Sequence, residues 1–347
     1  MRGIIYDVER YFSEGKKVAL ATVIQTWNSS PRGVGARMAM TPEGNISGSV
    51  SGGCVEGAVY QAGLKTLKTG RPQLLHFGVA DETAWEVGLA CGGSIDVFVE
   101  PLDHSEFQSI WACIKEDKPI ALAKVVRGPE NFVGQLLMVC DSTIVYNKLE
   151  GKLRKKTFDA ALQCLSEGKP QQLDLELVGE EHVRLFIDVV LPSPTLVIVG
   201  GVHIAVALSS IAKVLGYRTI LIDPRAAFGN LDRFPTVDKL IQKWPKEAFS
   251  QLKLDNNTAV AVLTHDPKID DPALMIALSS RAFYIGVLGS HTTQVRRRQR
   301  LLETGVNGEL LNRLHGPIGL DIGGATPEEI ALAIMAEIVA VNRRGSL

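Results

Sequence analysis

The stretch "TLVIVGGVHIAVALSSIAKVLGYRTILID", residues 195–223, decides the fold of the C-terminal part of the chain. A continuous apolar run over 195–200 predicts a strand that is buried on both faces, and a second run over 217–223 predicts another. Between them, residues 202–216 carry apolar side chains at helical spacing, and Gly216 stands where a helix commonly ends. Strand, helix and strand in this order indicate a parallel β-α-β unit.

The same alternation continues downstream of this unit. Apolar runs over 237–242, 259–264 and 283–289 predict further buried strands, and helical patterns follow the last two. Upstream, the two prolines of "LPSPT" (191–195) mark a domain boundary. We therefore expect a Rossmann-like, doubly wound parallel-sheet domain over residues 195–347.

The N-terminal part of the chain has a different pattern of short strands and helices. Strand-like runs occupy 18–27, 36–41, 74–78, 94–102, 120–126 and 134–140, and helical patterns fall near 4–15, 54–69, 104–117 and 157–167. They predict a mixed α/β domain over residues 1–145. The weaker signal over 146–194 predicts a connecting segment, and no internal repeat is evident.

Composition excludes several classes of protein. The chain has 347 residues, more than one hydrophobic core usually serves, and its formal net charge is −1. With no basic excess and no long apolar run, we expect neither a nucleic-acid nor a membrane partner. The odd number of dispersed cysteines favours a reduced, cytoplasmic protein over a disulfide framework or a zinc site. These are Cys54, Cys91, Cys113, Cys140 and Cys164.

The glycine turn after residue 199 matches most of a dinucleotide-binding fingerprint. Gly200 and Gly201 end a strand, His203 begins a helix whose N-terminus would face a phosphate, and Asp223 is placed to bind a ribose hydroxyl. However, Val202 stands where the fingerprint has its middle glycine, and a β-branched side chain there obstructs the pyrophosphate. Two interpretations remain open: an NAD(P) site, or a turn that only joins strand to helix.

Polar residues also follow two later strands. His265 and Asp266 end the strand over 259–264, and Ser290 ends the strand over 283–289. Because ligands bind at the carboxyl ends of parallel strands, these residues are candidates for ligand contact, with helix capping as the alternative. A capping box is predicted at Thr326 and Glu329, and "VRRRQR" (295–300) is predicted to be a solvated helix face, with an acidic partner as the alternative.

In the N-terminal domain, "SGSVSGGCVEGAVYQAGLKTLKTG" (47–70) combines a glycine turn with a thiol. The apolar positions that follow have helical spacing, so Cys54 is expected in the first helical turn, directly after Gly52 and Gly53. Unpaired N–H groups and the helix dipole at such a position bind anions and favour a thiolate. A thiolate suits a soft metal centre or sulfur transfer.

Two further motifs belong with this turn. "GLACGGSIDVFVE" (88–100) places Cys91 before Gly92 and Gly93, so that both cysteines can approach one site. "NSSPRGVGARM" (28–38) places Arg32 and Arg37 among glycines. This loop either holds an anionic group or is a flexible hairpin connection.

Taken together, these motifs resemble those of the XdhC/CoxI family, the accessory proteins of xanthine dehydrogenase and related molybdenum hydroxylases. The resemblance rests on "SSPRGVGARMAMTPEGNISGSVSGGCVEGAV", on "GLACGGSIDVFVEP" and on the C-terminal blocks "VIVGGVHIA", "LIDPR", "RFP", "LTHD", "GVLGS" and "PIGLDIGGATPEEIALAIMAEI". The blocks span nearly the whole chain in family order.

The resemblance implies a cytoplasmic homodimer that binds molybdenum cofactor (molybdopterin). Such a protein protects the cofactor while a cysteine desulfurase provides sulfur, and delivers it to xanthine dehydrogenase or a related enzyme, as a chaperone more than a catalyst. The family's glycine-flanked cysteine matches Cys54, which implies a molybdenum contact, and its CGG turn matches Cys91. Two alternatives remain: an NAD(P)-dependent oxidoreductase, and a sulfur carrier with a persulfide on Cys54.

Overall fold

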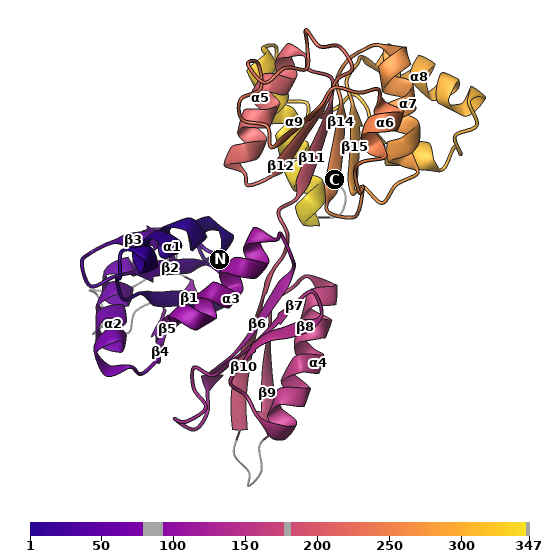
Figure 1. The fold of residues 1–347 in the computed structure, drawn as a ribbon. Coiled ribbons are helices and arrows are strands. Elements are labelled where there is room, and N and C mark those ends of the chain that lie inside the picture. Colours follow the sequence, from indigo (N-terminus) through magenta and orange to yellow (C-terminus); the bar gives the residue numbers. More distant parts are fainter. Residues whose placement is uncertain (79–92, 177–181, 345–347) are drawn as a thin grey trace. The chain divides into compact units, whose positions relative to one another are not determined.

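A computed structural model describes residues 1–78, 93–176 and 182–344 (Figure 1). The chain forms two compact units, Met1–Pro192 and Ser193–Leu347. Within these described ranges, the first unit has two five-stranded sheets and the second has one six-stranded sheet. Among the described residues, no helix is both long and apolar enough to span a lipid bilayer.

The first sheet is antiparallel, with the strand order β3-β2-β1-β5-β4. Its buried face packs against α2, where Val55 and Val59 contact the apolar side chains of β1, β2 and β5. The elements are η1 (Arg2–Ile4), α1 (Ile5–Ser13), β1 (Ala19–Trp27), β2 (Arg37–Met40), β3 (Ile46–Gly48), α2 (Glu56–Thr69), β4 (Gln73–Phe77) and β5 (Ser94–Pro101).

The second sheet is also antiparallel, with the order β8-β7-β6-β10-β9. Its elements are α3 (His104–Lys115), β6 (Ile120–Arg127), β7 (Leu136–Cys140), β8 (Thr143–Asn147), α4 (Gly151–Glu167), β9 (Gln171–Glu176) and β10 (His182–Val190). The prediction of a connecting segment over 146–194 is therefore wrong. Leu153, Ala161 and Cys164 bury one face of α4 against this sheet, although charged residues dominate the segment.

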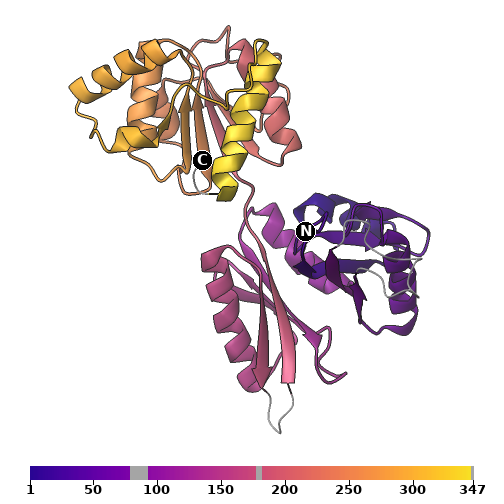
Figure 2. The same cartoon turned by 180° about the vertical axis from the view of Figure 1, so that it is seen from behind.

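The two sheets are built alike, which corrects the expectation that the chain has no repeat. Each is formed by a helix, three strands, a second helix and two strands, and the strands take the same spatial order in both. Figures 1 and 2 show α2 and α4 each lying along its own sheet. An apolar core joins the two sheets, with Leu20 and Ala39 from the first and Leu122 and Met138 from the second.

Buried ion pairs connect the two sheets within this core. Arg37 on β2 pairs with Asp188 on β10, and Lys124 on β6 lies 2.7 Å from a carboxylate oxygen of Glu100 and 2.7 Å from one of Glu106. Burial, with a smaller contribution from Glu106, raises the pKa of Glu100 to about 7 although Lys124 opposes the shift. One ammonium thus faces two carboxylates away from water.

The second unit is a doubly wound parallel sheet with the order β13-β12-β11-β14-β15-β16, as predicted. Helices α5 and α9 cover one face, and α6, α7 and α8 cover the other (Figure 1). The strands are β11 (Thr195–Val199), β12 (Arg218–Ile222), β13 (Lys239–Ile241), β14 (Thr258–Val262), β15 (Tyr284–Val287) and β16 (Leu314–His315). The helices are α5 (His203–Val214), α6 (Pro245–Phe249), α7 (Pro267–Leu278), α8 (His291–Glu303), η2 (Leu310–Arg313) and α9 (Pro327–Arg344).

Candidate functional site

The glycine motifs of the first unit meet at one edge of its first sheet. Trp27 pairs with Ser94, Phe77 pairs with Ile95 and Gly48 pairs with Met38, so β1, β3 and β4 end at the edge where β2 and β5 begin. The connections after these three strands therefore start from the same edge. We call residues 28–36, 49–55 and 93 the thiol edge.

Two close approaches show that these loops touch. A Cβ atom added to Gly93 would lie 2.2 Å from the carbonyl oxygen of Ser29, so only glycine fits there. A Cβ atom added to Gly52 would lie 3.8 Å from Cβ of Pro31. The loop with Arg32 thus packs tightly against Gly93 and passes close to Gly52. Cys91 and Gly92 lie outside the described residues.

The thiol of Cys54 is exposed on this edge. Gly52 and Gly53 have φ values of 83° and 128°, which side chains rarely adopt, and they turn the chain outward. The helix begins at Glu56 with Val55 as its N-cap, so Cys54 precedes the helix and is not in its first turn as expected. The side chain of Val55 is completely buried, which fixes the turn against the sheet and leaves its neighbour Cys54 in solvent.

The donors of this turn converge on the carboxylate of Glu56. Oε1 accepts from the backbone N–H groups of Val50 (3.2 Å), Ser51 (2.9 Å) and Gly52 (3.0 Å), and Oε2 accepts from that of Gly53 (2.9 Å). The hydroxyl groups of Ser49 (2.6 Å) and Ser51 (2.5 Å) donate as well. Partial burial favours the neutral acid, but these hydrogen bonds prevail and lower the pKa of Glu56 to about 2.

This geometry corrects one expectation about the turn. The sequence predicts that its N–H groups face an external anion, whereas in the structure those of residues 50–53 bind the chain's own carboxylate. What the turn presents to a ligand is therefore the sulfur of Cys54.

The two arginines of the 28–38 motif have different roles. Arg32 is exposed on the thiol edge. Arg37 is the first residue of β2, and its buried side chain pairs with Asp188 of the second sheet. Arg37 therefore joins the two sheets and is not available to an anion in the loop.

In the second unit, the glycine turn is closed by the chain itself. Asp223 is fully buried, and its carboxylate accepts from the Gly201 N–H (2.7 Å) and from the Arg225 side chain (2.9 and 2.8 Å). Burial opposes ionisation, yet these donors lower the pKa of Asp223. Asp223 is thus not available to a ribose hydroxyl, contrary to the prediction from its spacing.

The backbone after Asp223 also covers Gly201. A Cβ atom on Gly201 would lie 2.4 Å from the carbonyl oxygen of Phe228, and Arg233 donates to the carbonyl groups of Gly201 (2.7 Å) and Phe228 (3.0 Å). Glycine is therefore required at 201 by the chain's own backbone, without a pyrophosphate. His203, the first residue of α5, is exposed beside this turn.

The carboxyl ends of β11 and β14 come together as expected. A Cβ atom on Gly200 would lie 2.5 Å from Cγ2 of Thr264. His265 is exposed and has a φ of 62°, an uncommon conformation for a residue with a side chain. Asp266 accepts from the Lys268 N–H (2.9 Å) and Ser290 accepts from the Thr293 N–H (3.3 Å), so both residues cap helices.

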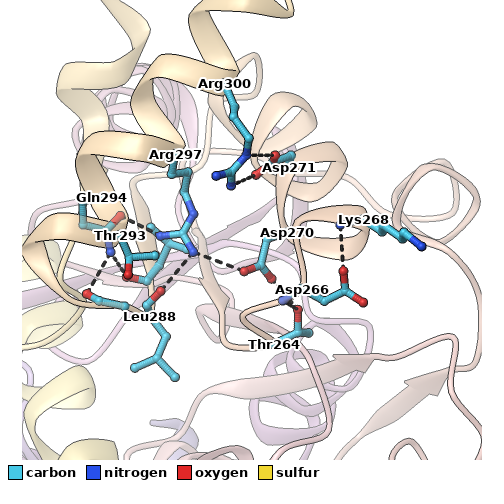
Figure 3. Close-up of polar contacts among 12 residues, drawn as sticks. Thr264, Asp266, Lys268, Asp270, Asp271, Leu288, Thr293, Gln294, Arg297 and Arg300 are labelled. Atoms are coloured by element: carbon cyan, nitrogen blue, oxygen red, sulfur yellow. Dashed lines mark hydrogen bonds and ion pairs between the residues drawn. The ribbon is translucent and has the colours of Figure 1, made fainter.

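Behind these strand ends lies a buried network that the sequence did not predict (Figure 3). Arg297, from the predicted solvated "VRRRQR" face, is only 2% exposed and donates to Gln294 Oε1 (2.7 Å) and to the Leu288 carbonyl group (3.1 Å). It also pairs with Asp270 (3.3 Å), which accepts from Thr264 (2.6 Å). Burial raises the pKa of Asp270. The available signal was spacing, since Gln294, Arg297 and Leu301 share one helix face.

A hollow of about 460 Å³ lies between His291 and residues 317–324. The predicted capping box next to it is confirmed. Glu329 accepts from the N–H groups of Ala325 (2.8 Å) and Thr326 (3.0 Å), and Thr326 accepts from that of Glu329 (3.3 Å). Within the described ranges of the chain, no three His, Cys, Asp or Glu side chains form a group that could hold a metal ion.

Comparison with known families gives two matches that together span more than half of the chain. Residues 12–78 match the model of the XdhC and CoxI family, and residues 196–338 match the model of the XdhC Rossmann domain. The first range includes Arg32 and Cys54, and the second includes Asp223 and Arg297.

Individual proteins resemble the chain over nearly its whole length. A probable xanthine dehydrogenase subunit from Bacillus subtilis (strain 168) is 27% identical over 342 residues, which cover 97% of each protein. The molybdenum cofactor insertion chaperone PaoD of Escherichia coli (strain K12) is 25% identical over 339 residues, 97% of this chain and 87% of PaoD. The crystal structure of a xanthine dehydrogenase from Bacillus halodurans shares the fold, with a TM-score of 0.78 and 24% identity over 98% of this chain and 95% of that one.

Proposed function

Because this chain belongs to the XdhC and CoxI family, we propose that it is an accessory protein that holds molybdenum cofactor and passes it to xanthine dehydrogenase or a related molybdenum hydroxylase. Two relatives that cover the chain almost completely are named for xanthine dehydrogenase and for molybdenum cofactor insertion. On this proposal the protein acts in the cytoplasm as a homodimer, and receives the sulfur for the cofactor from a cysteine desulfurase.

The observation that carries the proposal is the exposed sulfur of Cys54 on the thiol edge. A cysteine sulfur is a soft ligand, and molybdenum held by a dithiolene is a soft centre. The turn that bears Cys54 is fixed by the buried Val55 and by the hydrogen bonds to Glu56, so the sulfur needs little ordering when the cargo binds. Arg32 on the same edge adds a positive charge toward an anionic cargo.

The test is retention of the cofactor by a cysteine variant. We expect wild-type protein to retain molybdenum cofactor in stoichiometric amount, and Cys54→Ala to lose at least about tenfold in affinity with its unfolding transition unchanged. Cys164→Ala is the matched control, because Cys164 is a free cysteine buried in α4. Wild-type retention by Cys54→Ala contradicts the proposal.

The same exposed sulfur supports a second candidate, a sulfur carrier. In that case the thiolate of Cys54 attacks the outer sulfur of a desulfurase persulfide, forming a persulfide on Cys54 and releasing the desulfurase thiolate. Mass spectrometry after incubation with desulfurase and cysteine distinguishes the two. One added sulfur atom on the Cys54 peptide favours transfer, and an unmodified peptide favours ligation.

An NAD(P)-dependent oxidoreductase is the less favoured alternative. A dinucleotide would need a free carboxylate at Asp223 and an open glycine turn at Gly201. Asp223 is buried, and the carbonyl group of Phe228 covers Gly201. We therefore expect a fluorescence titration to show no binding of NADH up to about millimolar concentration. Enzymes commonly bind their substrates more tightly than this.

A further inference from the structure

The two halves of the first unit are copies of one module, and the sequence retains traces of both. "EGKKVALATV" (14–23) and "EDKPIALAKV" (116–125) each lead from the end of a helix into the central strand of a sheet. They make the same local contacts, since Lys16 pairs with Glu14 (2.6 Å) and Lys118 pairs with Glu116 (2.7 Å). We treat residues 5–101 as the first copy and residues 104–190 as the second.

A second pair of positions lies just before β2 and β7. Gly35 and Gly134 each follow a valine and have φ values of 85° and 87°. The Gly35 N–H donates to the Val23 carbonyl group (2.8 Å), and the Gly134 N–H donates to the Val125 carbonyl group (2.9 Å). The two hairpin connections therefore enter their second strand in the same way.

The helices α2 and α4 align the two copies around the thiol edge. Both end at a left-handed glycine, Gly70 and Gly168, followed by "RPQ" and "KPQ". Counting back from these glycines, the buried helical positions coincide: Val59 with Thr157, Gly63 with Ala161 and Thr66 with Cys164. In this alignment Lys152 stands at the position of Cys54 and Arg154 at that of Glu56, although Lys152 lies within α4 and Cys54 precedes α2.

The second copy has a hollow at the edge that corresponds to the thiol edge. The strands β6, β8 and β9 again end at one edge of their sheet. The connections after β6 and β8, the start of α4 and Glu176 at the end of β9 contribute to a hollow of about 920 Å³, lined by Phe132, Lys148, Glu150, Lys152, Lys156 and Glu176 among others. This volume is within the range of small-molecule sites.

The lining indicates the chemical class of ligand. Lys148, Lys152 and Lys156 provide ammonium groups for a phosphate, and Phe132 provides an aromatic face. The carboxylates of Glu150 and Glu176 accept hydrogen bonds from ring N–H groups. The turn that Glu56 closes has no counterpart among the described residues here, because α4 already begins at Gly151, arginine stands at the position of Glu56, and no side-chain hydrogen bond from Glu150 caps α4.

We propose that this hollow is a binding site for a phosphorylated heterocycle, centred on Lys152 as the counterpart of Cys54. The identity of the heterocycle as the phosphate-bearing pterin of the cargo rests on the proposed function, whereas the site itself does not. A free nucleotide is the other source of the same chemistry.

The probe is guanosine monophosphate, which combines a phosphate with ring N–H donors. In isothermal titration of the full-length protein, we expect binding of the monophosphate, and a loss of about tenfold in affinity for Lys152→Gln and for Lys156→Gln. Lys155→Gln is the matched control, because Lys155 is an exposed residue of the same helix that does not line the hollow. All three side chains are exposed, so the variants are expected to fold.

Three results would overturn the proposal: no binding of the monophosphate, equal binding of guanosine, or an equal loss for Lys155→Gln. Competition then identifies the source of the ligand. Displacement of molybdenum cofactor by the monophosphate assigns the site to the cargo, and simultaneous binding assigns it to a separate nucleotide. Because cofactor retention through Cys54 is measured independently, failure of this site is distinguishable from failure of the proposed function.

Discussion

At the scale of single residues, Glu56 shows how the chain fixes a reactive turn without a bound ligand. Six donors from residues 49–53 surround one carboxylate. Such convergence is typical of anion sites, and here the anion is covalently part of the loop. The conformation that exposes Cys54 is therefore available before any cargo arrives.

Neutralising this carboxylate should loosen the turn. For Glu56→Gln we expect the free energy of unfolding of the first unit to fall by about 1–2 kcal/mol near neutral pH, after discounting the pKa shift for solvent screening. An amide also places a donor against the N–H groups of the turn. Urea unfolding measures the loss, with Glu9→Gln on the exposed face of α1 as the control.

The effect has a defined pH dependence. Because the pKa of Glu56 is lowered from 4.5 to about 2 on folding, its contribution is complete above the unfolded value and disappears as the pH falls toward the folded one. The difference between wild type and Glu56→Gln should therefore shrink between about pH 5 and about pH 3. A constant difference over this range would mean that the carboxylate charge does not stabilise the turn.

Glu100 titrates with the opposite sign. Its pKa rises from 4.5 to about 7 on folding, so its favourable contribution exists at low pH and is lost as the pH rises between these values. Relative to Glu100→Gln, wild-type protein should lose about 2–3 kcal/mol of stability between about pH 5 and about pH 8. Parallel stability curves for the two proteins would contradict this expectation.

At the scale of elements, the Arg297 network couples α7, α8 and the end of β15. Replacing Arg297 by Met leaves the Asp270 carboxylate buried without its cation, which should cost about 3–5 kcal/mol in the second unit. Arg296→Met on the exposed side of α8 should change stability by less than about 0.5 kcal/mol. Chemical denaturation compares the two, and equal effects would show that the buried pair contributes nothing specific.

The same elements show what the sequence predicts and what it leaves open. Buried strands such as 195–200 are continuous apolar runs, so the parallel sheet follows from local pattern alone. Arg297 is different, because a charged side chain in a charged segment is buried only by its partners Asp270 and Gln294, which the local pattern does not reveal. The prediction for the segment 146–194 fails for a similar reason, since its charged helix α4 and its strands β9 and β10 complete a sheet whose other strands, β6, β7 and most of β8, come earlier in the chain.

The candidate site is likewise predicted only in part by the sequence. Spacing and glycine content identify the loops that meet at the thiol edge, including the exposed Cys54. They do not reveal that Glu56 fills the turn, or that Arg37 and Asp223 are occupied by Asp188 and Arg225, because each of these pairs depends on side-chain directions in the folded chain.

At the scale of the whole molecule, the chain divides between Pro192 and Ser193 into two units, each with its own apolar core. We expect a fragment of residues 193–347 to fold alone and to unfold cooperatively, because its sheet is covered on both faces by its own helices. Circular dichroism with urea titration checks this. A broad, non-cooperative transition would show that the second unit needs the first.

The ion pairs between the two sheets also make the two halves of the first unit depend on each other. Glu100 and Asp188 hold equivalent positions, opposite Leu20 and Leu122, and each neutralises a base from the other copy, Lys124 and Arg37. Deleting either half would therefore strand a charged side chain of the other half in the interior without its counterion.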